Sequence, residues 1–145
     1  MRISDILRVK GTNVVTVTPE SDVTSLLALL AEHKIGAVVV SRDGVRVDGI
    51  VSERDVVRAL AARGAAVLTE AVSAIHTAQV RSVAPDANID EVERLMTEHR
   101  FRHVPVLEGG TLAGVVSIGD VVKHRIDELE IERRSLEGYI TGERI

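Results

Sequence analysis

The chain has 145 residues, enough for one domain or for two small repeats that share a body. It contains no cysteine, which excludes a disulfide framework, a thiol nucleophile and a cysteine-based zinc site. Phe101 and Tyr139 are its only Phe, Tyr or Trp residues and its formal net charge is −4, so a nucleic-acid-binding surface is not expected.

The first half predicts the order strand, helix, strand, strand, helix. Pro19 suits the first turn of a helix, because its missing N–H would have no partner there, and Gly36 is expected to mark the end of that helix. Asp43-Gly44 predicts a hairpin turn. The predicted elements are a strand at 14–17, a helix at 20–33, strands at 37–40 and 45–51, and a helix from Ser52.

The second half predicts the same order. A short helical piece precedes each half, at residues 4–7 and 73–76, and a glycine pair at 109–110 supplies the second hairpin turn. The predicted elements are a strand at 80–83, a helix at 86–99, strands at 103–107 and 112–116, and a helix from Ser117.

Residues 123–139 predict that the last helix continues beyond the repeat. Ile126, Leu129, Leu136 and Ile140 lie roughly along one face of this helix, and charged residues make up the remainder. Two interpretations stay open: a tail that caps the body, or a helix that docks a partner or a second copy.

The two halves are related by a nearly constant shift in numbering. A shift of 66 positions superposes Glu32-His33 on Glu98-His99, and a shift of 65 superposes the segment 49–57 on 114–122. The second superposition repeats the pattern Gly-x-x-Ser-x-x-Asp, which keeps polar residues as well as apolar ones. A duplicated core needs only a hydrophobic pattern, so the repeated serine and aspartate suggest a duplicated site.

In each copy of the motif, the serine ends a strand at a helix N-cap and the aspartate follows at the third helical position. The first turn of a helix favours an anion such as phosphate, and an ionised aspartate can accept hydrogen bonds from ribose hydroxyls. The alternative is a capping box, in which the acid only returns to the cap N–H. Arg54 could contact phosphate or could be a solvated surface residue.

With its glycine-led strand and its repetition, the pattern resembles the cystathionine-β-synthase-type (CBS) domain, and the chain looks like a stand-alone tandem CBS pair. The resemblance implies an α/β (α+β) fold in which two β-α-β-β-α repeats pack around a pseudo-twofold axis, as in a Bateman module. The expected boundaries are 1–66 for the first repeat, 67–125 for the second and 126–145 for a C-terminal helical extension.

The resemblance also implies two clefts between the repeats that take adenosine-containing ligands. Each cleft combines the motif of one repeat with strands of the other, and the aspartate holds the ribose. Arg102 and His103 are the candidates for meeting phosphate. The first cleft would use Ser52, Arg54, Asp55, Ala78, Val80, Phe101, Arg102 and His103, and the second would use Thr12, Val14, Ile35, Gly36, Ala37, Ser117 and Asp120.

The two clefts are expected to bind with unequal affinity, because Glu53-Arg54 in the first motif becomes Ile118-Gly119 in the second. The expected ligand is AMP, since a monophosphate needs only modest positive charge; ATP, ADP, NAD-type dinucleotides and S-adenosylmethionine are alternatives. No cofactor is required and no metal site is expected, because the helix should end between His99 and His103.

We therefore expect a non-catalytic sensor that binds an adenine nucleotide, forms a homodimer and is read by a client protein that the sequence does not identify. A second hypothesis is a structural dimerisation module in which the motifs act as helix caps. An enzyme is the least supported class, since neither motif serine lies in a Gly-x-Ser-x-Gly elbow. The chain start lacks a signal-peptide apolar stretch and no apolar run approaches the ~20 residues of a membrane span, so a cytoplasmic protein is expected.

Overall fold

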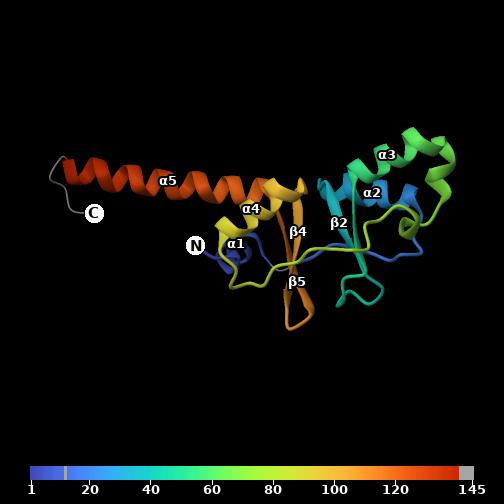
Figure 1. Cartoon of the computed structure of the whole chain (residues 1–145), viewed down its shortest axis with the longest axis horizontal. Helices are drawn as coiled ribbons and strands as arrows, with labels where there is room; N and C mark the ends of the chain where they lie inside the picture. The colour runs from blue at the N-terminus through green and yellow to red at the C-terminus, as the bar shows by residue number, and fades with distance from the viewer. Residues whose placement is uncertain (12, 141–145) are drawn as a thin grey trace.

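The computed structural model describes residues 1–11 and 13–140 and has the predicted α+β fold, with two sheets and a long C-terminal helix (Figure 1). In Figure 1 the helices α2, α3 and α4 lie toward one end of the strands, and both hairpin loops lie at the opposite end. The first part of the chain forms α1 (Ile3–Lys10), β1 (Thr16–Val17), α2 (Val23–His33), β2 (Ala37–Val40), β3 (Gly49–Ser52) and α3 (Glu53–Arg63). The second part forms the 3₁₀ turns η1 (Gly64–Thr69) and η2 (Val72–Ala74), then α4 (Ile89–His99), β4 (His103–Glu108), β5 (Thr111–Ser117) and α5 (Ile118–Ile140).

The boundaries of α2 and α4 correct two sequence-based expectations. Pro19 does not start a helix, because α2 begins four residues later, where the carboxylate of Asp22 accepts a hydrogen bond of 2.7 Å from the Ser25 N–H. Gly36 is not the residue that ends α2. That position belongs to Lys34, whose φ of 53° is left-handed, and Arg100 ends α4 in the same way with a φ of 56°.

The two sheets follow the predicted strand order, but β1, β3 and the strand expected at 80–83 are shorter than predicted. β1 pairs parallel to β2 and β2 antiparallel to β3, while β4 pairs antiparallel to β5. The predicted strand at 80–83 is reduced to one parallel bridge between Val83 and Val106. The predicted strand at 45–51 starts only at Gly49, because the carboxylate of Asp43 accepts the N–H groups of Val45 and Arg46 and holds that stretch in a turn.

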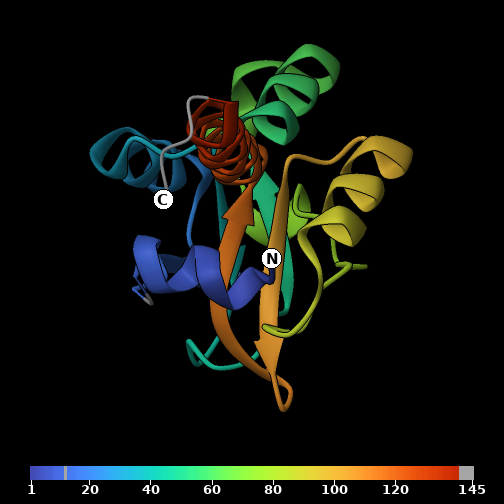
Figure 2. The same ribbon diagram turned by 90° about the vertical axis from the view of Figure 1, so that its left-hand side faces the viewer.

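The hydrophobic core of each half includes a segment that lies, in sequence, just before the other half. The helix α1 packs in the core of the second half, where Ile3, Ile6 and Leu7 are buried with residues of α4, β4 and β5. The segment that contains η1 and η2 packs in the core of the first half through Val67 and Val72. Figure 2 shows α1 lying across the β4–β5 hairpin. The two halves are therefore joined by exchanged segments, as well as by the chain itself.

The helix α5 projects from the body for most of its length (Figure 1). Near its base, the guanidinium of Arg125 bridges to Asp90 and Glu93 on α4 and to Glu128 on α5 itself, which fixes the direction of the helix. Further along, Leu129 and Leu136 are 57% and 64% exposed. Beyond its first turns, α5 therefore does not cap the body. Among the described residues, no helix is both long enough and apolar enough to span a bilayer.

Candidate functional site

The first motif forms the helix cap that the sequence predicts. Ser52 caps α3 and accepts a hydrogen bond from the Asp55 N–H, while Asp55 Oδ2 accepts the Ser52 N–H at 2.9 Å. This arrangement is a capping box. Both side chains are only half-buried, so the carboxylate keeps an open side next to the first turn of α3. The same turn presents unpaired N–H groups that favour an anion.

A cavity of about 890 Å³ opens beside this motif and is lined by both halves of the molecule. The first half contributes the start of α3 and the beginning of β2. The second half contributes the segment before Val83, the end of α4 and the beginning of β4. The lining residues are Gly36, Ala37, Ile50, Ser52, Glu53, Arg54, Asp55, Val57, Arg58, Thr77, Gln79, Val80, Arg81, His99, Arg100, Phe101, Arg102 and His103.

The segment that follows η2 reaches the cavity by pairing with the edge of β3. Thr77 and Ile50 exchange two backbone hydrogen bonds of 2.9 and 3.0 Å, which carry the chain onward along the mouth of the cavity. Gln79, Val80 and Arg81 line the cavity as a result. This segment passes so close to the start of β3 that only a glycine fits there, since a Cβ on Gly49 would lie 2.8 Å from the carbonyl oxygen of Thr77.

The cavity is strongly basic. Its lining contains two carboxylates, those of Glu53 and Asp55, against a set of guanidinium groups that form no ion pair with any described residue. The arginines of this set come from α3 and from the second half, and they are Arg54, Arg58, Arg81, Arg100 and Arg102. Because guanidinium groups bind phosphate with charge-assisted and often bidentate hydrogen bonds, the cavity suits an anionic ligand.

The rings of His99 and Phe101 stack at the cavity wall, with centroids 5.8 Å apart and planes 8° from parallel. His99 ends α4 and His103 begins β4, so the helix stops between them as predicted. No group of three or more His, Asp or Glu side chains within residues 1–11 and 13–140 is placed to hold a metal ion.

His103 lies between the two motifs. It pairs with Ser117 across the β4–β5 ladder, and a Cβ on Gly36 would lie 3.6 Å from its ring. Burial and the nearby charge of Lys10 lower the pKa of His103 below its usual value. A lowered pKa favours the neutral ring near pH 7, so Arg102 rather than His103 supplies positive charge at this end of the cavity.

The second motif has the same cap but an additional partner. Asp120 Oδ2 accepts the Ser117 N–H at 2.9 Å and also the ammonium of Lys10 at 2.6 Å. The same ammonium donates to the carbonyl oxygen of Val115 at 2.8 Å. Burial acts to raise the pKa of Asp120, but the hydrogen bonds from Lys10 and Ser117 outweigh it and leave that pKa below its usual value. The two motif acids therefore have different surroundings.

The structure brings most of the predicted first-cleft residues together. Ser52, Arg54, Asp55 and Val80 line the 890 Å³ cavity with Phe101, Arg102 and His103, whereas Ala78 lies between two lining residues without being one itself. The predicted second-cleft residues are distributed differently: Gly36 and Ala37 line the first cavity, Ile35 packs against the core of the first half, and Val14 is half-buried away from the cavity lining. Thr12 lies outside the described residues.

Sequence reasoning missed several arginines of the cavity. Arg58 follows Arg54 by four residues on α3, so helical spacing could have placed both on one face. Arg100 corresponds to Lys34 under the 66-residue shift, and both residues end equivalent helices. Arg81 carried no local signal, because its position depends on the pairing between Thr77 and Ile50.

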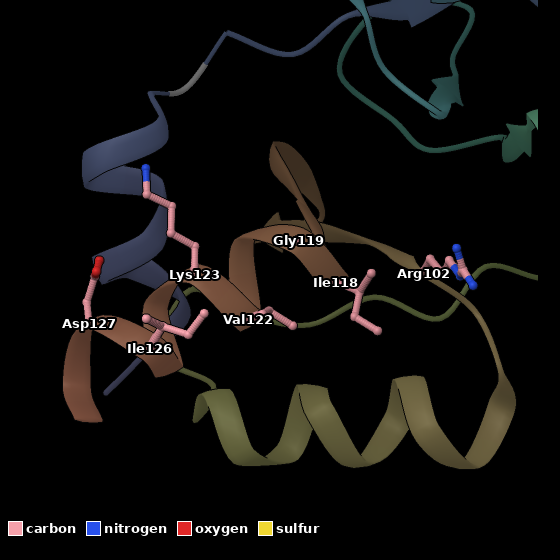
Figure 3. Close-up of a pocket in the computed structure, with 7 residues that line it drawn as sticks. All are labelled: Arg102, Ile118, Gly119, Val122, Lys123, Ile126 and Asp127. Carbon is pink, nitrogen blue, oxygen red and sulfur yellow. The ribbon is translucent and has the colours of Figure 1, made fainter. Parts of the chain in front are cut away.

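A second, smaller hollow of about 560 Å³ lies at the base of α5 (Figure 3). Its lining is mainly apolar, from Ile118, Val122 and Ile126, with Lys123 and Arg102 as basic residues at its edges. Arg102 therefore borders both the basic cavity and the hollow beside α5. The remaining lining residues are Gly119 and Asp127.

Comparison with known proteins identifies the fold. A family model of the CBS domain matches residues 3–62 and 72–127. The CBS domain-containing protein CBSX3, mitochondrial, of Arabidopsis thaliana is 32% identical over 97% of this chain and 72% of its own length. The crystal structure of the CBS-domain containing protein ATU1752 from Agrobacterium tumefaciens is 48% identical, with a TM-score of 0.83 over 86% of this chain and 99% of that one.

A third relative was solved with a ligand. The CBS domain protein PAE2072 from Pyrobaculum aerophilum, in complex with AMP, is 29% identical to this chain and has a TM-score of 0.78, covering 92% of this chain and 99% of its own. The repeat in the sequence, the two equivalent helix caps and the match of the family model to both halves lead to one conclusion: the chain belongs to the CBS domain family and contains a pair of CBS repeats.

Proposed function

We propose that this CBS pair is a regulatory module that binds an adenine nucleotide in the 890 Å³ cavity beside Ser52 and Asp55. The observation that carries the proposal is the meeting, in one cavity, of a half-exposed carboxylate, a helix N-terminus and several arginines that form no ion pair within the part of the chain that the structure describes. Asp55 would hold the ribose hydroxyls, and the arginines together with the first turn of α3 would hold the phosphates. AMP binding by PAE2072 supports the assignment of ligand class.

The charge of the cavity favours phosphorylated ligands. AMP, ADP, ATP and NAD-type dinucleotides all bring negative charge to Arg54, Arg58 and Arg81. S-adenosylmethionine carries a positive sulfonium and adenosine carries no phosphate, so both should bind more weakly. Modest positive charge does not single out AMP here, because the arginines can accommodate more than one phosphate. We therefore expect ADP and ATP to bind at least as tightly as AMP.

The module would act by binding, without chemistry. The nucleotide would contact both halves and so stabilise one arrangement of the two repeats, which a client protein could read. Asp55 is engaged as a helix cap, and the proposal gives each residue named for the ligand a binding role. The family match points to no enzyme family.

Isothermal titration calorimetry with adenosine, AMP, ADP and ATP tests the proposal. Asp55→Asn should weaken AMP at least tenfold, because hydrogen bonds to a charged group contribute about 1.5–3 kcal/mol. Asp22→Asn is the matched control, since Asp22 caps α2 outside the cavity and asparagine is an equally good cap. The proposal fails if no adenine nucleotide binds to the wild-type protein, or if Asp55→Asn and Asp22→Asn bind AMP equally well.

A second function, self-association through α5, is favoured by the exposed face of that helix. Five apolar side chains on this face are each at least 50% exposed: Val122, Ile126, Leu129, Leu136 and Ile140. Together with Arg133, which lies between Leu129 and Leu136, they follow one another at alternating spacings of four and three residues. This is the heptad spacing of a coiled coil. The hollow in Figure 3 continues the same face at the base of the helix.

We propose that the partner on this face is a second copy of the chain, running antiparallel. In a parallel pair, the two Arg133 side chains would face each other across the seam. In an antiparallel pair, each Arg133 faces Leu129 of the second copy and lies next to Glu132 of the second copy, so the charges are complementary.

Light scattering coupled to size-exclusion chromatography tests this arrangement. Leu129→Glu should convert a dimer into a monomer, whereas Ile131→Glu should not, because Ile131 is similarly exposed but lies off the seam. The dimer proposal is wrong if the wild-type protein is a monomer, or if the two variants dissociate to the same extent.

A further inference from the structure

The aspartate of the second motif is bound by an ammonium group of the protein itself, and the aspartate of the first motif is not bound by any ammonium among the described residues. Lys10, the last residue of α1, places its ammonium 2.6 Å from Asp120 Oδ2 and 2.8 Å from the carbonyl oxygen of Val115. The carboxylate side chain is 24% exposed. The ammonium therefore lies on the same oxygen of Asp120 that accepts the Ser117 N–H of the helix cap.

The first motif has no such contact. Asp55 corresponds to Asp120 under the 65-residue shift, and within the described residues its carboxylate accepts hydrogen bonds from Ser52 alone. The carbonyl oxygen of Ile50, which corresponds to that of Val115, is taken by the Thr77 N–H. The two equivalent carbonyl oxygens thus have different donors, the backbone N–H of Thr77 at Ile50 and the ammonium of Lys10 at Val115. Of these two donors, only Lys10 also contacts the motif aspartate.

This contact opposes nucleotide binding at the second motif. A ribose held by a carboxylate donates its two hydroxyls to the two oxygens, and Asp120 Oδ2 already accepts from both Ser117 and Lys10. A ribose hydroxyl that binds Oδ2 must displace the ammonium, which also donates to the Val115 carbonyl oxygen, and a hydroxyl on the other oxygen would still lie next to that cation. Asp55 Oδ2 also accepts two hydrogen bonds, but both come from Ser52, so no cation among the described residues has to be displaced there.

We infer that the ammonium of Lys10 takes the place of a ribose at Asp120 in the second cleft. Each chain therefore binds one nucleotide, at Asp55 only. The inference rests on the proposed function and adds to it the number and location of the sites. Lys10 is thus a specificity-determining residue, since it decides which of two repeated motifs receives a ligand. Its removal should reveal the second site.

Calorimetry with AMP as the probe tests this inference through the number of bound molecules. Wild-type protein should bind one AMP per chain, and Lys10→Met should bind two. The sharpest comparison starts from a weakened first cleft: Asp55→Asn alone should bind AMP at least tenfold more weakly than the wild-type protein, and Asp55→Asn combined with Lys10→Met should regain one tight AMP per chain. Lys34→Met is the control, because it removes an exposed lysine that has no ion pair among the described residues.

The outcomes separate this inference from the proposed function. Two AMP molecules on the wild-type chain, or no gain of binding with Lys10→Met in either background, overturns the role of Lys10 while leaving an adenine site at Asp55. Absence of AMP on the wild-type chain with one AMP on Lys10→Met overturns the proposed site and keeps the role of Lys10. Absence of binding by both proteins overturns both.

A second measurement applies to the wild-type protein alone, in case Lys10→Met does not fold. With ¹³C-labelled aspartate, addition of AMP should shift the carboxyl resonance of Asp55 and leave that of Asp120 in place. Equal shifts of both resonances contradict the inference.

Discussion

Asp55 and Asp120 each combine a structural role with an available binding role. In both motifs one oxygen, Oδ2, accepts the N–H of the capping serine, and this bond completes the capping box. A carboxylate has acceptor capacity for several hydrogen bonds, so capping leaves room for a ligand. The two interpretations of the motif are therefore compatible, and the neighbouring charge decides whether the remaining capacity is used. At Asp120 that neighbour is Lys10, and at Asp55 it is a set of arginines.

The surroundings of His103 predict that stability depends on pH. Burial and the charge of Lys10 lower the pKa of His103 in the folded protein, whereas the unfolded chain takes up this proton near the usual value of 6.5. Below pH 6.5 the unfolded state therefore binds more protons than the folded state, and the free energy of unfolding should decrease until the folded-state pKa is reached. Urea denaturation at about pH 7.5 and about pH 5.5, on either side of the usual histidine pKa, measures the difference.

The variant His103→Gln should show a smaller loss of stability over the same interval, because the group that titrates has been removed. His33→Gln provides the comparison, since His33 is exposed at the end of α2. If His103→Gln and the wild-type protein lose the same free energy between the two pH values, burial of this ring does not control the dependence.

At the level of the elements, two glycines allow the exchanged segments to cross the sheets. Gly49 begins β3 beneath the segment that leaves η2, and Gly114 lies in β5 beneath α1. A Cβ on Gly114 would lie 2.6 Å from the Cδ2 atom of Leu7, at the end of a flexible side chain. A Cβ on Gly49 would instead meet the carbonyl oxygen of Thr77 at 2.8 Å, which is backbone held by two hydrogen bonds.

Substitution of these two glycines by alanine should therefore have unequal effects. Gly49→Ala should destabilise the protein by about 1–3 kcal/mol or more, as overpacking against backbone does, while Gly114→Ala should cost less because Leu7 can change rotamer. The free energy of unfolding in urea distinguishes the two. Since Thr77 lines the 890 Å³ cavity in which we propose that AMP binds, Gly49→Ala should also weaken AMP binding. Equal destabilisation by the two variants would contradict this explanation of the crossing.

Local chemistry determined which elements could be predicted. Ser52 and Ser117 give helix starts that depend only on nearby residues, and β2 is a continuous apolar run, so these elements appear where the sequence places them. The start of α2 was misplaced because Asp22 and Pro19 are both plausible helix starts and only the hydrogen bond to Ser25 separates them. The strand expected at 80–83 failed because its pairing depends on a partner far along the chain.

The site was predictable to the same extent. The repeated Ser-x-x-Asp motifs and their resemblance to the CBS family indicated Ser52, Asp55 and Arg102, all of which line the cavity. The contact between Lys10 and Asp120 joins residues 110 positions apart, and nothing in the local sequence of α1 marks it. Differences between the motifs predicted unlike clefts, but they did not identify the residue that makes them unlike.

At the scale of the whole molecule, the exchange of segments means that the core of each half contains residues from a distant part of the chain. The core of the second half includes Ile3, Ile6 and Leu7 from the beginning of the chain, and the core of the first half includes Val67 and Val72 from the segment between the helices α3 and α4. Two repeats of this size would each be marginal alone. The boundaries at 66–67 and 125–126 remain a prediction about the repeat in the sequence, and the cores do not follow the first of these boundaries.

This dependence predicts that a change at the N-terminus destabilises the distant second half. Ile3 is fully buried in that core, so Ile3→Ala should cost about 2–5 kcal/mol, whereas Val9→Ala should cost little because Val9 is on the same helix and 80% exposed. Native-state hydrogen exchange should show that the amides of β4 and β5 lose protection in Ile3→Ala. Because η1 and η2 join the first core to the same chain, the amides of β2 should lose protection with them, in one cooperative unit. Unchanged protection of β4 and β5 would mean that α1 is an appendage, and loss confined to those strands would mean that the two halves unfold separately.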